Sequence, residues 1–184
     1  MGASMIFRFL IVFLISFSIA ESQYSFPHYS AKKSTTSGTP SYDNPMGMGD
    51  RQSSIAESDN GAFGTGGIAP IINGSRTDET TWFTSQTASG LEITFDFGAP
   101  QIITEITWYQ SSTAEHGTWI IQAHNGGTWD DVGSSFTLGG ATTQVITAPS
   151  SNTTGYRYYI LVGLSGTTSD GPYIHEIEFK LVAE

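Results

Sequence analysis

The chain has 184 residues, a formal net charge of −10 at pH 7 and only 13% charged residues. This length suits one domain of roughly 100–150 residues plus an extension. The negative charge repels phosphate backbones, which argues against nucleic-acid binding. The absence of cysteine excludes disulfides, thiol catalysis and cysteine-ligated zinc. Abundant glycine and 12% aromatic residues favour a turn-rich all-β domain.

The first 20 residues, MGASMIFRFLIVFLISFSIA, differ from the rest of the chain. They combine a positive charge at Arg8, an apolar run from Phe9 to Ile19 and a small residue at Ala20. This pattern is typical of a secretory signal peptide cleaved after Ala20. The run is shorter than the roughly 20 apolar residues of a membrane-spanning helix. An uncleaved anchor, with residues 5–20 in a membrane, and a hydrophobic arm buried in an assembly are the alternatives.

Residues 21–49 are predicted to form a flexible linker or docking arm. Residues 21–48 are rich in Ser, Thr, Pro and Gly and show no apolar period. Such a segment orders only when a partner covers it. Other virion proteins are one class of partner that this arm would suit.

From residue 50 to residue 184 the pattern is that of strands. LEITFDF (91–97) alternates apolar and polar residues, the period of a half-buried strand. Gly, Asn and Pro clusters separate further candidates, and no segment of ten or more residues has a convincing helical period. The predicted fold class is all-β, an antiparallel β-sandwich of jelly-roll type. The other candidate strands are 102–109, 118–124, 142–148, 156–163 and 173–181.

Three segments, in this order, resemble discoidin domains, also called coagulation factor V/VIII type C domains, which include the family 32 carbohydrate-binding modules. The first, residues 68–98, resembles their opening loop and strand, and GTWIIQAHNGGTWDDVG resembles their central hairpin. YRYYILVGLSGTTSDGPYIHEIEF resembles their closing strands. FTLGGATTQ, NTTGYRYY and SDGPYIHEIEF are also similar to discoidin-like domains on tailed-phage virion proteins.

The resemblance implies a galactose-binding-like jelly roll that binds glycans or lipid head groups through loops at one end, rather than an enzyme. It also implies a structural Ca²⁺ near the opening loop. Asn73-Gly74 replaces the usual Asp-Gly, which removes one negative charge from the site. Ca²⁺ is coordinated by six to eight oxygens. The alternative is that the glutamate simply hydrogen-bonds the loop, with no cofactor. The residues placed at this metal site are Glu176, with loop oxygens around Asn73, Ser75, Asp78 and Thr81.

The residues themselves give little support to catalysis. Asp130 and Asp131 are neighbours on a strand-like stretch, so their side chains point to opposite faces and cannot readily work as a pair. The sequence has no G-x-S-x-G, H-E-x-x-H, P-loop or Rossmann motif. We therefore expect a protein that is not an enzyme. The remaining alternative is a hydrolase, or an accessory domain of a larger enzyme.

The four tryptophans are attractive sugar-stacking candidates, but strand-like or hairpin positions predict that they belong to the core. These are Trp82, Trp108, Trp119 and Trp129. The loops are the better candidates for binding, because loops carry recognition while the sandwich carries stability. The alternative for each loop residue is an ordinary solvated side chain. The predicted ligand-binding residues are Tyr109, Gln110, Glu115, His116, Asp170 and Tyr173, whereas His124, beside the NGG turn, is predicted to be a surface or cross-strand residue.

Two functional hypotheses follow. The first is a non-catalytic carbohydrate-binding or adhesion module, secreted or on a virion surface, that binds an extracellular or cell-surface glycan through its end loops. The alternative is a structural virion decoration, capsid or tail subunit, docked by its N-terminal arm and without glycan binding.

Overall fold

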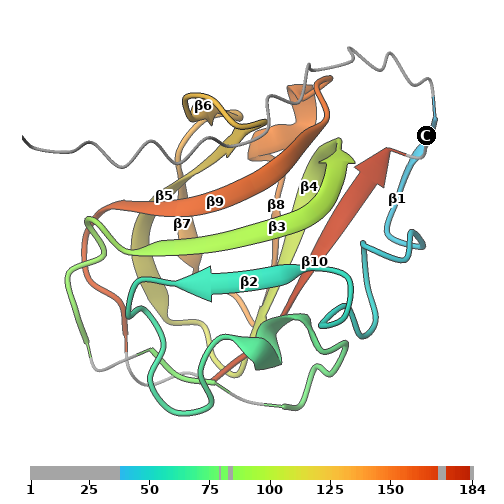
Figure 1. The fold of residues 1–184 in the computed structure, drawn as a ribbon. Coiled ribbons are helices and arrows are strands. Elements are labelled where there is room, and N and C mark those ends of the chain that lie inside the picture. Colours follow the sequence, from blue (N-terminus) through green and yellow to red (C-terminus); the bar gives the residue numbers. More distant parts are fainter. Residues whose placement is uncertain (1–37, 79, 83–84, 170–172, 183–184) are drawn as a thin grey trace, which may run out of the picture.

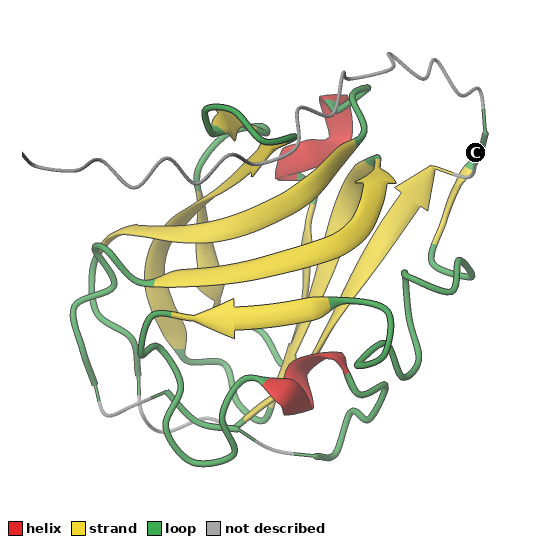
Figure 2. Ribbon diagram, viewed as in Figure 1, coloured by secondary structure: helices red, strands yellow, loops and turns green. Residues whose placement is uncertain are grey.

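The computed structural model describes residues 38–78, 80–82, 85–169 and 173–182. The predicted signal peptide, residues 21–37 of the predicted arm and the candidate Asp170 lie outside these residues. Two antiparallel sheets stack face to face, with two short 3-10 helices at their ends (Figures 1 and 2). This arrangement confirms the predicted all-β sandwich. No helix within the described part of the chain is long and apolar enough to cross a membrane.

The sheets have four and six strands, and every strand pair is antiparallel. The four-stranded sheet has the order β1 (Pro40–Ser41), β10 (Ile174–Val182), β4 (Ile103–Gln110), β8 (Thr143–Ile146). The six-stranded sheet has the order β2 (Ala56–Asp59), β3 (Glu92–Gln101), β9 (Tyr156–Ser165), β5 (Glu115–His124), β6 (Asp130–Asp131), and β7 (Phe136–Gly139) pairs with β5. The 3-10 helices are η1 (Ala69–Ile72) and η2 (Ala148–Ser151).

Alternation of apolar and polar residues places the strands as expected. In β3 the side chains of Ile93, Phe95 and Phe97 are buried, while Thr94 and Asp96 face outward and are half-buried. The predicted strands at 102–109, 118–124, 142–148, 156–163 and 173–181 correspond to β4, β5, β8, β9 and β10. The short strands β1, β2 and β7 were not among the predicted strands, because two to four residues give little evidence of a period.

Aromatic side chains fill the core between the sheets. The rings of Trp82 and Trp108 lie 6.0 Å apart, and those of Trp82 and Trp119 lie 5.7 Å apart. All three side chains are buried, which confirms their predicted place in the core. The prediction for Trp129 is wrong, because its side chain is 40% exposed. Trp129 lies outside a strand, just before β6, and so no alternation directs it inward.

Residues 40–49 belong to the folded domain, although the sequence assigned them to the linker or arm. Pro40 and Ser41 pair with Val182 and Leu181 at the edge of the four-stranded sheet. Downstream, the backbone N–H of Phe179 donates to the carbonyl of Gly47 at 2.8 Å. Backbone pairing at an edge needs no apolar period, which explains why the sequence pattern did not reveal it.

Candidate functional site

Two of the predicted loop residues, Gln110 and His116, are core residues. Their exposed fractions are 2% and 0%. The Gln110 side-chain oxygen accepts a hydrogen bond from Trp108 Nε1 at 2.8 Å and lies 3.0 Å from His116 Nε2. The His116 ring packs 5.0 Å from that of Trp82. Their assignment to ligand contact is therefore wrong: β5 begins at Glu115, so the exposed loop is shorter than predicted and His116 points inward.

The His116 environment fixes its protonation. Burial lowers the pKa of His116 to about 4, so the ring is neutral at neutral pH. Its Nδ1 accepts the backbone N–H of Ser169 at 3.2 Å, which leaves Nε2 to donate to Gln110. The Gln110 amide nitrogen in turn donates to the carbonyls of Ser112 and Ala114, each at 2.8 Å. This closed network holds the loop after β4 in place and leaves neither side chain available to a ligand.

Tyr109 lies on the outer face of the four-stranded sheet and is engaged on two sides. Its hydroxyl donates to Glu178 Oε2 at 2.9 Å, and the guanidinium of Arg76 covers its ring at 4.2 Å. Burial raises the pKa of the Tyr109 hydroxyl to about 12. Among the predicted binding residues that the structure describes, only Glu115 and Tyr173 are exposed. The described residues of the predicted set thus provide two exposed side chains, while Tyr109, Gln110 and His116 are engaged within the domain.

The residues proposed for calcium do not fit that ion. Glu176 is fully buried, with Oε1 against the guanidinium of Arg51 and Oε2 accepting the backbone N–H of Gly74 at 3.0 Å. The Asn73 amide donates to Asp78 Oδ2 at 2.7 Å, so its nitrogen rather than its oxygen faces that carboxylate. A guanidinium beside the buried carboxylate already supplies the positive charge.

The other predicted calcium ligands are engaged within the opening loop. The Ser75 hydroxyl accepts the backbone N–H groups of Thr77 and Asp78, and the Thr81 carbonyl accepts the N–H of Gly64. In the described parts of the chain no three His, Asp or Glu side chains form a group that could hold a metal ion. Glu176 thus hydrogen-bonds the opening loop through the backbone N–H of Gly74.

A surface that the sequence analysis did not select lies on the outer face of the six-stranded sheet. The exposed Trp129 ring meets the His124 ring edge to face at 4.2 Å, and His124 stacks on Tyr158 at 4.7 Å. We call Trp129, His124 and Tyr158 the aromatic row. The guanidinium of Arg157 continues it, 4.8 Å above the Tyr158 ring.

The hairpin turn and the strand register build this row. Asn125 joins the turn to β9 by donating to the Gly155 carbonyl at 2.9 Å and accepting the Arg157 N–H at 2.9 Å. Gly126 has a φ of 94° and donates its N–H to His124 Nδ1 at 2.7 Å. Burial lowers the pKa of His124, and the accepting Nδ1 likewise favours the neutral ring.

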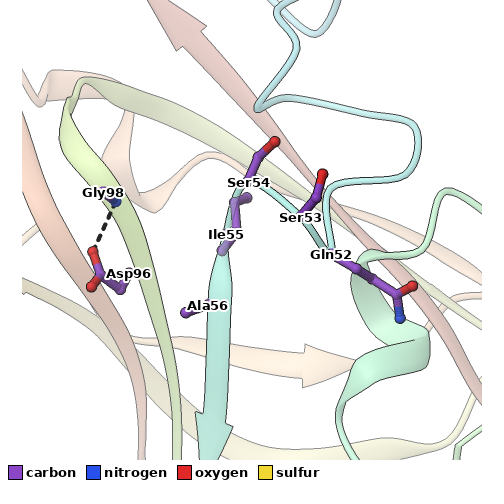
Figure 3. A pocket seen from close by; sticks show the side chains of 7 residues that line it. All are labelled: Gln52, Ser53, Ser54, Ile55, Ala56, Asp96 and Gly98. Carbon is purple, nitrogen blue, oxygen red and sulfur yellow. Dashed lines mark hydrogen bonds between the residues drawn. The ribbon is translucent and has the colours of Figure 1, made fainter.

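The aromatic row ends near a hollow of about 220 Å³ beside β2 and β3 (Figure 3). Asp96 connects the two features: it binds Arg157 through both carboxylate oxygens at 2.7 Å and accepts the N–H of Gly98 at 2.8 Å. The hollow is lined by Gln52, Ser53, Ser54, Ile55, Ala56, Asp96 and Gly98.

One sequence signal could have distinguished Trp129 from the core tryptophans. Trp119 alternates with Ile121 and Ala123 along β5, and all three are buried. Trp129 follows the NGG turn and precedes two aspartates, so no buried apolar residue lies two positions away on its C-terminal side. A tryptophan without such a neighbour is a candidate surface residue.

No family model and no curated protein matches this sequence, but solved structures share its fold. The family 32 carbohydrate-binding module of C. perfringens NanJ, solved in complex with galactose, superposes with a TM-score of 0.55 at 13% identity, covering 72% of this chain and 98% of that chain. The family 32 module of AlyQ, in complex with 4,5-unsaturated mannuronic acid, gives a TM-score of 0.50 at 22% identity, covering 67% and 92%.

A third structure, truncated AlyQ, carries a family 32 module together with an alginate lyase domain. It gives a TM-score of 0.52 at 21% identity, covering 70% of this chain and 32% of that one. At these identities the likeness concerns the fold. The chain has the galactose-binding-like β-sandwich fold of family 32 carbohydrate-binding modules.

Proposed function

We propose that the protein is a non-catalytic glycan-binding module whose binding surface is the aromatic row. The observation that carries the proposal is the exposed Trp129 ring, held edge to face by His124 on the outer face of a rigid sheet. An exposed tryptophan with a fixed orientation is a large amphipathic contact surface that loses little entropy when it binds. Its face suits the C–H face of a pyranose.

Polar groups for sugar hydroxyls lie next to this ring. Asp130 and Asp131 directly follow Trp129 and are exposed, and Asp131 accepts a hydrogen bond from Gln122 at 2.8 Å. The Tyr156 hydroxyl lies 3.4 Å from Asp130 Oδ2. An aromatic platform bordered by a few polar groups is the usual composition of a small-molecule site. The same fold occurs in structures of carbohydrate-binding modules, which supports the proposal.

The carboxylates around the row support binding rather than hydrolysis. Asp96 makes a bidentate ion pair with Arg157, which lowers the Asp96 pKa and keeps this carboxylate ionised. Asp130 and Asp131 are consecutive in β6 and so project to opposite sides. General acid catalysis requires a carboxyl with a raised pKa opposite a second carboxylate. We propose no reaction at this site.

The test compares two exposed aromatic residues in different places. Trp129→Ala removes the proposed platform, and Tyr173→Ala removes the 46% exposed ring at the originally predicted loop end. We expect glycan-array and calorimetric binding of the wild type to be lost in Trp129→Ala and kept in Tyr173→Ala. The reverse pattern would place binding at the loop end, and a correctly folded wild type that binds no glycan would exclude the function.

We propose that the module acts outside the cell that makes it, either secreted or displayed on a virion. The signal-peptide pattern of residues 1–20 supports export. Display on a carrier is the second candidate, because the chain enters the domain through β1 in the four-stranded sheet, whereas the aromatic row lies on the other sheet. Deletion of residues 1–37 tests this candidate: it should abolish incorporation into a particle while leaving glycan binding unchanged.

A further inference from the structure

We propose that the ligand of this surface is a neutral, linear oligosaccharide that lies across the strands of the six-stranded sheet, from Trp129 to the hollow lined by Ser53 and Ser54. This inference rests on the proposed glycan-binding function and adds the ligand class and its direction. It differs from the binding of one terminal sugar by end loops.

The strand register sets the direction of the site. Ala56 pairs with Asp96, Asp96 with Tyr158, and Tyr158 with His124. These four residues form one straight row across β2, β3, β9 and β5, on the face away from the buried Phe95 and Tyr159. Neighbouring strands are about 4.8 Å apart, so the three steps from Ala56 to His124 span about 14 Å. Trp129 and the hollow extend this row at its two ends.

The length of the row exceeds one sugar ring and suits an oligosaccharide. Figure 1 shows β2, β3 and β9 side by side along the front of the molecule, so the row crosses a continuous sheet rather than a gap between loops. In Figure 3, Asp96 and Ala56 lie on adjacent strands at the hollow, with Ser53, Ser54 and Gln52 on the segment that leads into β2.

The chemistry changes along the row in a way that suits a sugar chain. At one end Trp129 offers an exposed ring for stacking, and in the middle Arg157 and Asp96 form a paired polar group. At the other end Ser53, Ser54 and Gln52 are exposed and line the hollow with two hydroxyls and an amide. Stacking orients a sugar, and hydroxyls and amides exchange hydrogen bonds with its hydroxyl groups.

The charge of the surface favours a neutral chain. Arg157 and Asp96 neutralise one another, while Asp131 remains exposed on the face of the aromatic row, opposite Gln122. The whole chain carries a net charge of −10. An anionic polysaccharide such as a uronate would meet the Asp131 carboxylate, which lies on the same face as Gln122, and a repulsive field.

The row is preorganised, which makes an extended contact favourable. His124 is held by Tyr158 and by the Gly126 N–H, and Arg157 is held by both oxygens of Asp96. Side chains that are already ordered lose little freedom when a ligand binds. Each further sugar along the row therefore adds contact at a low entropic cost.

The experiment measures affinity against chain length by calorimetry. The probes are neutral manno-, cello-, β-1,4-galacto- and N-acetylchito-oligosaccharides of increasing length, together with alginate oligosaccharides as the anionic series. For one neutral series we expect affinity to rise about tenfold or more between monosaccharide and tetrasaccharide, and the anionic series to bind more weakly. Equal affinity for both lengths, or stronger binding of the anionic series, would overturn this inference.

A pair of double variants locates the far end of the chain. Ser53→Ala/Ser54→Ala removes the hydroxyls of the hollow, and Ser150→Ala/Ser151→Ala is the control, since these exposed serines lie in η2 and do not line the hollow. The first variant should weaken the tetrasaccharide several-fold and leave the monosaccharide unchanged, while the control changes neither.

The outcomes separate the two proposals. If Ser53→Ala/Ser54→Ala behaves like its control while Trp129→Ala abolishes binding, the extended site is wrong and the glycan-binding function stands. If the folded wild type binds none of the probes at any length, both proposals are wrong.

Discussion

The guanidinium of Arg51 and the carboxylate of Glu176 form a fully buried ion pair between the segment that precedes β2 and β10. The guanidinium also donates to the carbonyls of Gly47 at 2.8 Å, Gly49 at 3.0 Å and Ile177 at 2.6 Å. Burial lowers the pKa of Arg51 to about 10, which still leaves it charged at neutral pH. One internal cation thus gathers a carboxylate and three carbonyl oxygens at the place where a metal was expected.

The first prediction is that calcium does not stabilise this domain. Because Arg51 already neutralises Glu176, the melting temperature of the wild type should be the same in EDTA and in millimolar Ca²⁺. Arg51→Met should lower the free energy of unfolding by about 3–5 kcal/mol, since it leaves a buried charge without a partner. Differential scanning calorimetry measures both.

Arg76→Met is the matched control for this prediction. Arg76 pairs with Glu178, but its side chain is 52% exposed, and such pairs contribute about 1 kcal/mol or less. A wild-type melting temperature that falls in EDTA, or an Arg51→Met variant no weaker than Arg76→Met, would contradict the role given to Arg51.

The second prediction concerns His116 and acid stability. Its pKa is about 4 in the folded chain and about 6.5 in the unfolded chain. Between about pH 6.5 and pH 4, His116 is protonated in the unfolded state but not in the folded state. The free energy of unfolding therefore falls as the pH drops through this range, and this contribution stops changing below about pH 4. This contribution is on the order of 3 kcal/mol. Chemical denaturation at pH 7 and pH 4.5 measures the loss.

His116→Gln separates this effect from other titrating groups. Glutamine cannot take up the proton, so the variant should be less stable than the wild type at pH 7 and should lose less stability on acidification. Equal losses in both proteins would show that His116 does not control the acid response.

The third prediction uses the close approach of β9 to the loop that precedes β3. A Cβ at Gly163 in β9 would lie 1.9 Å from the carbonyl oxygen of Ala88, which is backbone and cannot rotate away. Gly163→Ala should therefore destabilise the domain by about 1–3 kcal/mol or more. Gly127, in the turn before Trp129, has open space around its Cβ position and no positive φ. Gly127→Ala should leave the unfolding midpoint in urea nearly unchanged, and a similar shift in both variants would refute the steric argument.

The fold was predictable because period and burial agree along the long strands. The alternation in LEITFDF placed Ile93, Phe95 and Phe97 in the core without knowledge of any partner. The site was not predictable in the same way. His116 is polar and follows a loop-like segment, yet the direction of its side chain is decided by where β5 begins and by its packing against the Trp82 ring.

The aromatic row depends on strand register, which the periodicity of the sequence does not give. His124, Tyr158 and Asp96 lie 28 or more positions apart, and only the pairing register of three strands brings them into line. The sequence correctly put His124 at a strand end, but it could not give the partner across the sheet. Register is a tertiary property, so the predicted site stayed with the loops.

The last prediction tests how His124 supports Trp129. The edge-to-face contact at 4.2 Å is worth about 0.5–1.5 kcal/mol in such pairs, or roughly a twofold to tenfold change in affinity if it is needed to orient the indole. His124→Ala should therefore weaken glycan binding by roughly that factor, less than Trp129→Ala. His124→Phe keeps a ring in the same place and should restore affinity. If His124→Ala binds as the wild type does, Trp129 acts without this support; if His124→Phe fails as His124→Ala does, the imidazole itself contacts the ligand. Calorimetry of the three variants with one glycan decides between these cases.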